Sequence, residues 1–165
     1  MRLGRLMRHL ALPDWWMLRT FPKHTLASLE QAIAASEHGH RGELRFVVEA
    51  SLPFPELLHD ESPRARAIEL FSRLRVWDTE HNSGVLIYVQ LIDRHVEIVA
   101  DRGINIRVGE AFWRAVCRRM ESAFRDGQFE SGTLRALEEV TGALVEHFPA
   151  SGDNPDELPN TPVIL

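Results

Sequence analysis

The segment Val76–Gly103, VWDTEHNSGVLIYVQLIDRHVEIVADRG, decides the fold of this chain. Its run Val85–Leu91 is almost continuously apolar, which is typical of a strand covered on both faces of a sheet. The short turn 92–94 separates this run from a second apolar stretch, His95–Ala100. A turn of that length leaves no room for a crossover helix, so the two stretches are predicted to pair as an antiparallel hairpin.

The flanking sequence supplies one more strand and several helices. Glu43–Leu52 alternates apolar and polar residues, as a strand does, with Leu44, Phe46 and Val48 on one face. Ser62 followed by Pro63 is a helix N-cap with a first-turn proline, and the resulting strand–helix–strand order predicts that the first two strands are parallel. Further helices are predicted at Thr25–Glu37, Gly109–Asp126 and Thr133–Phe148. The fold class is therefore α/β, a three-layer α/β/α sandwich with a small mixed sheet and helices on both faces.

Charge divides the chain into one domain and two tails. Residues 1–23 hold five basic residues against one acid, together with Trp15 and Trp16, and residues 150–165 hold three acids, several prolines and no base. The domain itself is expected at residues 24–149, and the acidic tail is predicted to be disordered, with its apolar end at residues 163–165 expected to be frayed and docking of that end as the alternative. Because the domain is acidic and shows no basic face, nucleic acid is not expected as a partner.

The cysteine content and the apolar runs favour a cytoplasmic location. Cys117 is the only cysteine, which excludes an intramolecular disulfide and suits a reducing compartment. Arg5 and Arg8 interrupt the first apolar residues, which argues against a signal peptide, and no segment approaches the ~20 apolar residues of a membrane span. The helical spacing in Arg2–Leu12 has two interpretations: it docks on a protein partner or membrane surface, or it packs on its own domain.

Three carboxylates are the candidate metal ligands. Glu43 begins the first strand, Asp78 lies in the loop before the second, and Asp101 ends the antiparallel third. Those positions converge on one edge of the predicted sheet, and hard cations such as calcium or magnesium take several oxygen ligands. Each acid also has a purely structural interpretation: Asp101 and Asp78 cap their own turns, and Glu43 pairs with an arginine.

The runs GVLIYVQLIDRHVEIVADRG, VWDT and FRDGQFESGTLRALEEVTGALVEHFP resemble the TPM domain family, over roughly Leu26–Pro149. This family is best known from thylakoid-lumen repair proteins and is widespread in bacteria. The resemblance implies an α/β/α sandwich, and in several relatives calcium or magnesium sits in an acidic pocket around the loop matching VWDT and the Asp-Arg-Gly turn. It therefore implies ligand roles for Asp78 and Asp101, with Glu43 carried over through the Gly-Glu that opens the first strand. The chain departs from the family pattern at residues 81–83, where His, Asn and Ser stand in place of an Asp-Asn pair.

Three functions stay open at this stage. The first is a calcium- or magnesium-binding domain with a regulatory or binding role, and the second is a metal-assisted phosphatase, an activity reported as weak for some relatives. The third is a non-catalytic scaffold that docks through residues 1–23. No nucleophile or phosphate-loop motif identifies a catalytic residue, and the eight histidines form no zinc motif, although His81 is a candidate proton donor. The arginines of the helix after Ser62 are expected on a solvated face, namely Arg64, Arg66, Arg73 and Arg75.

Overall fold

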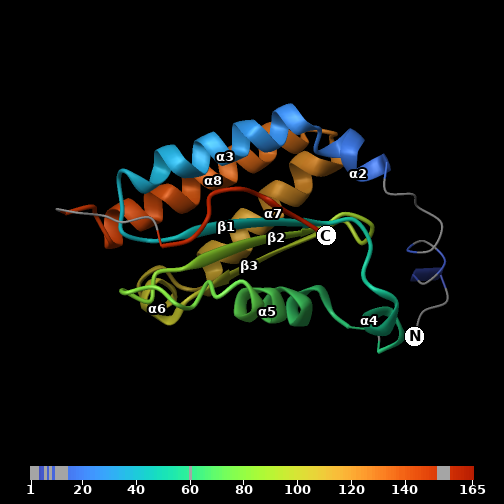
Figure 1. The fold of residues 1–165 in the computed structure, drawn as a ribbon, viewed down its shortest axis with the longest axis horizontal. Helices are drawn as coiled ribbons and strands as arrows, with labels where there is room; N and C mark the ends of the chain where they lie inside the picture. Colours follow the sequence, from blue (N-terminus) through green and yellow to red (C-terminus); the bar gives the residue numbers. More distant parts are fainter. Residues whose placement is uncertain (1–3, 6, 8, 10–14, 60, 152–156) are drawn as a thin grey trace.

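The computed structural model describes residues 4–5, 7, 9, 15–59, 61–151 and 157–165. At its centre lies a four-stranded mixed sheet with the order β3-β2-β1-β4 (Figure 1). The strands are β1 (Leu44–Glu49), β2 (Val85–Gln90), β3 (His95–Ala100) and β4 (Val163–Ile164). β1 and β2 run parallel, and β2 pairs antiparallel with β3, as the sequence predicts.

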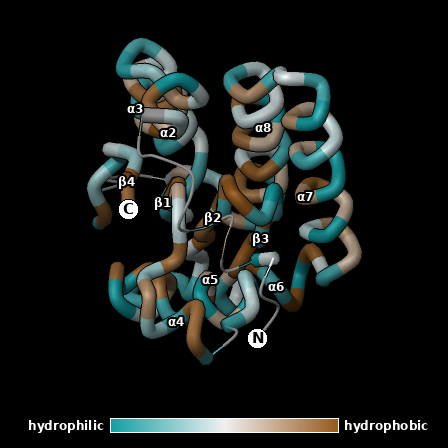
Figure 2. The backbone as a smooth tube through the Cα atoms, turned by 90° about the vertical axis from the view of Figure 1, so that its right-hand side faces the viewer, coloured by the Kyte–Doolittle hydropathy of each residue, from teal (hydrophilic) through white to brown (hydrophobic). Residues whose placement is uncertain are grey.

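Helices cover both faces of the sheet, which confirms the predicted three-layer α/β architecture (Figures 1 and 2). The helices of one face are α3 (Lys23–Glu37), α7 (Glu110–Arg125) and α8 (Phe129–His147). The opposite face carries α5 (Pro63–Arg73), whose N-cap Ser62 accepts a hydrogen bond from the Ala65 N–H at 3.1 Å. The described part of the chain also has three shorter helices: α2 (Trp15–Thr20), α4 (Phe54–Leu58) and α6 (Arg102–Val108).

Two apolar cores form because each strand of the sheet alternates its side chains between the faces. Phe46 and Val48 of β1 pack with Leu29 of α3 in the larger core. Val47, which points the other way, packs with Leu70 of α5 in the smaller one. All six β2 side chains are buried, as expected for a strand covered on both sides.

α8 begins at Phe129, four residues before the predicted start at Thr133. The additional turn packs Phe129 against Phe124, with ring centroids 5.0 Å apart. It also contains Gly132, where a Cβ would lie 2.7 Å from the Ala123 Cβ. A glycine inside a helix disfavours the helix in sequence terms, but here it allows α7 and α8 to approach closely.

The predicted disorder of the acidic tail is wrong for residues 157–165. Val163–Ile164 forms β4 and pairs in parallel with β1. The Leu165 N–H donates to the Val48 carbonyl oxygen at 3.0 Å, and Val163 packs against the smaller core. Since β1 would otherwise present unpaired backbone groups at the sheet edge, the apolar end of the tail finds a partner there. Residues 152–156 lie outside the described part of the chain.

Most of the predicted N-terminal docking helix, Arg2–Leu12, also lies outside the described residues. Of the described ones, Arg5 donates from Nε to Asp93 Oδ2 at 2.9 Å. The buried His9 ring accepts at Nδ1 from the Leu52 N–H at 3.1 Å. Both contacts hold this segment against its own domain. Across the described residues, none of the helices has the length and apolarity needed to span a membrane.

Candidate functional site

The backbone brings the first and third candidate ligands to one edge of the sheet. The Val85 N–H donates to the Glu43 carbonyl oxygen, and the Asp101 N–H donates to the Gly84 carbonyl oxygen, both at 2.8 Å. Glu43 and Asp101 therefore flank the start of β2 from opposite sides.

Asp101 is the N-cap of α6, as its structural interpretation anticipates. Its Oδ1 accepts from the Arg102 N–H at 2.6 Å. Its Oδ2 is buried and has no hydrogen-bond partner among the described residues. A buried carboxylate oxygen without a partner is costly, so Asp101 holds an unused ligand atom.

The loop before β2 is pressed against the start of α6. Asn82 has a positive φ of 51°, and its carbonyl oxygen accepts from the Ile104 N–H at 3.3 Å. At Gly103 a Cβ would lie 2.5 Å from the Asn82 carbonyl oxygen and 2.7 Å from that of His81. Only glycine permits this approach, which places two main-chain oxygens beside the residues that follow Asp101.

The Glu43 carboxylate, a predicted metal ligand, contacts the C-terminal segment of the chain. The residue is 3 % exposed, and its carboxylate accepts from the backbone N–H groups of Glu157 and Leu158 at 3.2 and 3.1 Å. Glu157 in turn accepts from the Glu80 N–H at 3.2 Å. Glu43 thus anchors the C-terminal segment over this edge of the sheet.

Asp78 is exposed and pairs with Arg75, three residues earlier. The proton-donor candidate His81 lies 3.3 Å from an Arg41 nitrogen and 3.8 Å from Glu80. In the part of the chain that the structure describes, no three or more Asp, Glu, His or Cys side chains are grouped so that they could hold a metal ion. The structure thus places two of the three predicted ligands in other interactions and leaves one with a free oxygen.

The family assignment follows from comparison with known proteins. The family model described as TPM domain matches residues 19–143. The chain belongs to the TPM domain family. No curated protein matches it.

Two solved structures share the TPM fold of this chain. BA42, a protein from the psychrophilic bacterium Bizionia argentinensis, is 30 % identical, with a TM-score of 0.74 and coverage of 86 % of this chain and 92 % of BA42. The N-terminal domain of a protein from P. gingivalis is 19 % identical, with a TM-score of 0.62 and coverage of 79 % and 82 %. The second likeness supports the fold alone.

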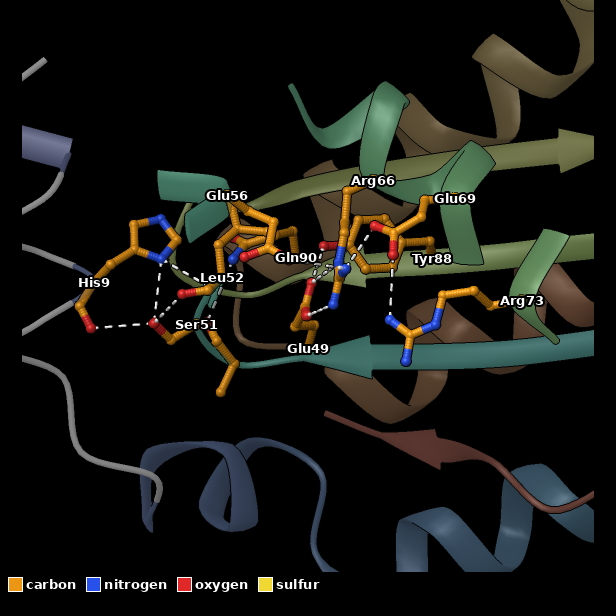
Figure 3. Close-up of polar contacts among 11 residues, drawn as sticks. His9, Glu49, Ser51, Leu52, Glu56, Arg66, Glu69, Arg73, Tyr88 and Gln90 are labelled. Atoms are coloured by element: carbon orange, nitrogen blue, oxygen red, sulfur yellow. Dashed lines mark hydrogen bonds and ion pairs between the residues drawn. The ribbon is translucent and has the colours of Figure 1, made fainter. Parts of the chain in front are cut away.

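This TPM domain also buries a charged cluster that the sequence does not reveal (Figure 3). Arg66 of α5 is 3 % exposed, so its assignment to a solvated face is wrong. Its Nη2 and Nε donate to Glu49 of β1 at 2.7 and 3.2 Å, and its Nη1 donates to Glu69 at 2.7 Å. The Tyr88 hydroxyl of β2 donates to Glu49 at 2.5 Å. In the sequence, the one indication of this cluster is Glu49, an acidic residue inside an apolar strand.

The pKa shifts in this cluster follow from its burial. Burial alone lowers the pKa of Arg66, but the hydrogen bonds and charge of Glu49 outweigh that effect and raise it above its usual range. Burial and the adjacent Glu49 raise the pKa of the Tyr88 phenol. The TPM domain therefore keeps Arg66 charged and Tyr88 protonated. The cluster accordingly has a structural role, because its hydrogen bonds link β1, β2 and α5.

Proposed function

We propose that this TPM domain binds a calcium or magnesium ion weakly at the Asp101 edge of the sheet and that the role of this binding is regulatory, not catalytic. The observation that carries the proposal is the buried Asp101 Oδ2 without a hydrogen-bond partner in the described chain. A divalent cation relieves that cost because it takes carboxylate and carbonyl oxygens as ligands.

The residues at this edge fit a cation in part. Asp101 would supply the carboxylate, and the adjacent loop carries the His81 and Asn82 carbonyl oxygens that approach Gly103. Glu43 and Asp78 are engaged with the tail backbone and with Arg75. Water would have to complete the coordination shell of the cation. We therefore expect a dissociation constant in the millimolar range, at the weak end of protein calcium sites.

A regulatory role suits the surroundings of Asp101. A bound cation would brace the loop before β2 against α6 and bias how firmly the tail at Glu157 packs on Glu80. The metal-assisted phosphatase remains the alternative, in which the ion polarises a phosphoryl oxygen. Cation-dependent hydrolysis of p-nitrophenyl phosphate, lost in Asp101→Asn, would favour it.

The test is thermal unfolding of the chelator-treated protein, titrated separately with calcium and magnesium. Asp101→Asn is the informative variant because asparagine also caps helices, and Asp126→Asn, an exposed acid after α7, is its matched control. We expect a saturable rise in Tm for the unaltered protein and for Asp126→Asn, and no rise for Asp101→Asn, since a ligand of the folded state stabilises it by mass action. An unchanged Tm at millimolar cation, or an equal rise in Asp101→Asn, would refute the site.

Docking through residues 1–23 to a partner protein or a membrane surface stays a prediction, because ten of these 23 residues lie outside the described part of the chain. A cytoplasmic location likewise stays a prediction, supported by the single cysteine.

A further inference from the structure

β3 is the outer strand of the sheet on the side opposite β4. The antiparallel register with β2, together with the bond from the Asp101 N–H to the Gly84 carbonyl, directs the backbone groups of Glu97 and Val99 toward β2. The backbone groups of Val96, Ile98 and Ala100 consequently point away from the sheet. This edge can form a ladder with another strand.

Side chains from both flanking helices occupy part of that edge. Glu121 of α7 accepts from the Val96 N–H at 3.0 Å. Arg64 of α5 donates to the Ile98 carbonyl oxygen at 2.6 Å. Each side chain satisfies a backbone group as a neighbouring strand would, and each is long enough to swing aside.

Open space runs along the same edge. A cleft of about 430 Å³ is lined by Val96, Ile98 and Ala100 on the strand side and by residues of α7, including Trp113, on the other. A smaller cleft of about 140 Å³ continues past the start of β3, and both are bordered by His95 and Glu121. The combined groove follows β3 from end to end, and the larger cleft falls within the ~300–1,000 Å³ of protein binding pockets.

In the larger cleft the charges leave one cation over, while Arg94 and Arg125 line the smaller one. His95 lies 2.9 Å from Glu97 and 3.1 Å from Glu121. Glu97 also lies 3.3 Å from Arg64. On α7, Glu110 lies 3.7 Å from Arg114. Arg118, one turn beyond Arg114, lines the groove, and the described residues provide it with no ion-pair partner. A carboxylate from a bound partner is the group that would pair with Arg118.

We propose that the β3 edge binds an extended segment of a partner protein by strand addition, with an acidic side chain of that segment placed at Arg118. Backbone hydrogen bonds to Val96, Ile98 and Ala100 replace the side-chain bonds of Glu121 and Arg64 and the contact of the Cys117 thiol with the Ile98 backbone. Main-chain pairing supplies affinity in this mode, and side chains supply selectivity. The site adjoins Asp101, because Ala100 directly precedes it in the chain, but it uses the outer backbone edge of β3 and requires no cation.

The experiment is an amide NMR titration of the ¹⁵N-labelled protein with the peptide acetyl-Val-Glu-Val-Asp-Val-amide. We expect hydrogen exchange at Ile98 and Ala100 to slow on binding, while Glu97 and Val99, already bonded to β2, change little. This alternation along one strand is the signature of strand addition. Perturbation confined to the arginine side chains, or no perturbation at millimolar peptide, would overturn the proposal.

Two controls separate strand addition from simple charge attraction. The same peptide with N-methylated amides keeps both carboxylates but cannot donate to the edge, so its binding should be lost; equal binding overturns the proposal. Arg118→Glu should weaken binding of the unmodified peptide about fivefold, the scale of an exposed charge pair, whereas Arg135→Glu on α8 should leave it unchanged. Equal weakening by both variants would also overturn it.

Discussion

Glu49 and Arg66 form a bidentate ion pair inside the smaller core, with nitrogen-to-oxygen distances of 2.7 and 3.2 Å. The pair links the end of β1 to α5, and the Tyr88 hydroxyl extends it to β2. A buried pair of this kind is costly to break because the remaining charge has no water to solvate it.

Glu49→Ala should lower the free energy of unfolding by about 3 kcal/mol, since Arg66 would stay buried without its bidentate partner and keep only the partly exposed Glu69 and Glu56. The double variant Glu49→Leu, Arg66→Met should recover most of that loss because neither of the two fully buried charges remains, and Glu69 and Glu56 are partly exposed to water. Urea unfolding measures both. The exposed control Glu146→Gln should stay within about 0.5 kcal/mol of the unaltered protein. A double variant no more stable than Glu49→Ala would contradict this account.

Glu43→Ala should loosen the C-terminal segment because the N–H groups of Glu157 and Leu158 lose their acceptor. We expect hydrogen exchange at the Leu165 amide, which bonds Val48, to accelerate at least about tenfold, as local opening becomes easier. Glu80→Ala is the control, because the Glu80 contact to the tail is made by its backbone. Unchanged exchange at Leu165 would show that β4 holds without Glu43.

Cys117 should react slowly with iodoacetamide in the folded protein. Burial raises the pKa of its thiol to about 12, and the thiolate is the reactive form. At pH 8 the rate should be about a thousandfold lower than in urea-unfolded protein, since the pKa is displaced by about three pH units from its ordinary value. Mass spectrometry of the alkylated protein over time measures it. Comparable folded and unfolded rates would show that the thiol is accessible.

His95 should make stability depend on pH. The hydrogen bond to Glu97 and the charges of Glu121, Glu97 and Asp93 raise its pKa against the opposing effect of burial. The resulting stabilisation is present in full below the unfolded pKa of about 6.5 and is lost as pH rises through the higher folded value.

We expect His95→Gln to flatten this fall in urea-unfolding stability. Because the His95 side chain is 42 % exposed, solvent screening limits the change to less than about 1 kcal/mol. The exposed His24→Gln serves as the control and should retain the slope. If stability still falls with rising pH in His95→Gln, the pH dependence arises from another titratable group.

Local pattern determined most of the fold. β3 spans the predicted His95–Ala100, and α5 begins at the predicted Pro63, because alternation, continuous apolar runs and caps act over a few neighbouring residues. Short helices carried weaker signals: α6 contains Gly103, and α4 has prolines at its start. Their formation depends on the elements against which they pack.

At the candidate site, the sequence predicted the positions of the acidic residues but not all of their contacts. The sequence placed Glu43 and Asp101 at strand ends, and strand direction brought both to one edge. It could not reveal that tail N–H groups occupy Glu43, because that contact joins residues more than a hundred positions apart.

The sequence by itself determined the order of the first three strands and the longer helices, the hairpin at Asp93, and membership of the TPM domain family. These features follow from local periodicity and from motifs that a linear sequence displays. Only the tertiary structure decided that Val163–Ile164 completes the sheet, that Glu49 receives Arg66, and that a groove lies along β3. Each of these features depends on contacts between residues that are far apart in the sequence. Such contacts form because an unpaired strand edge or a buried charge without a partner would be costly in the folded protein.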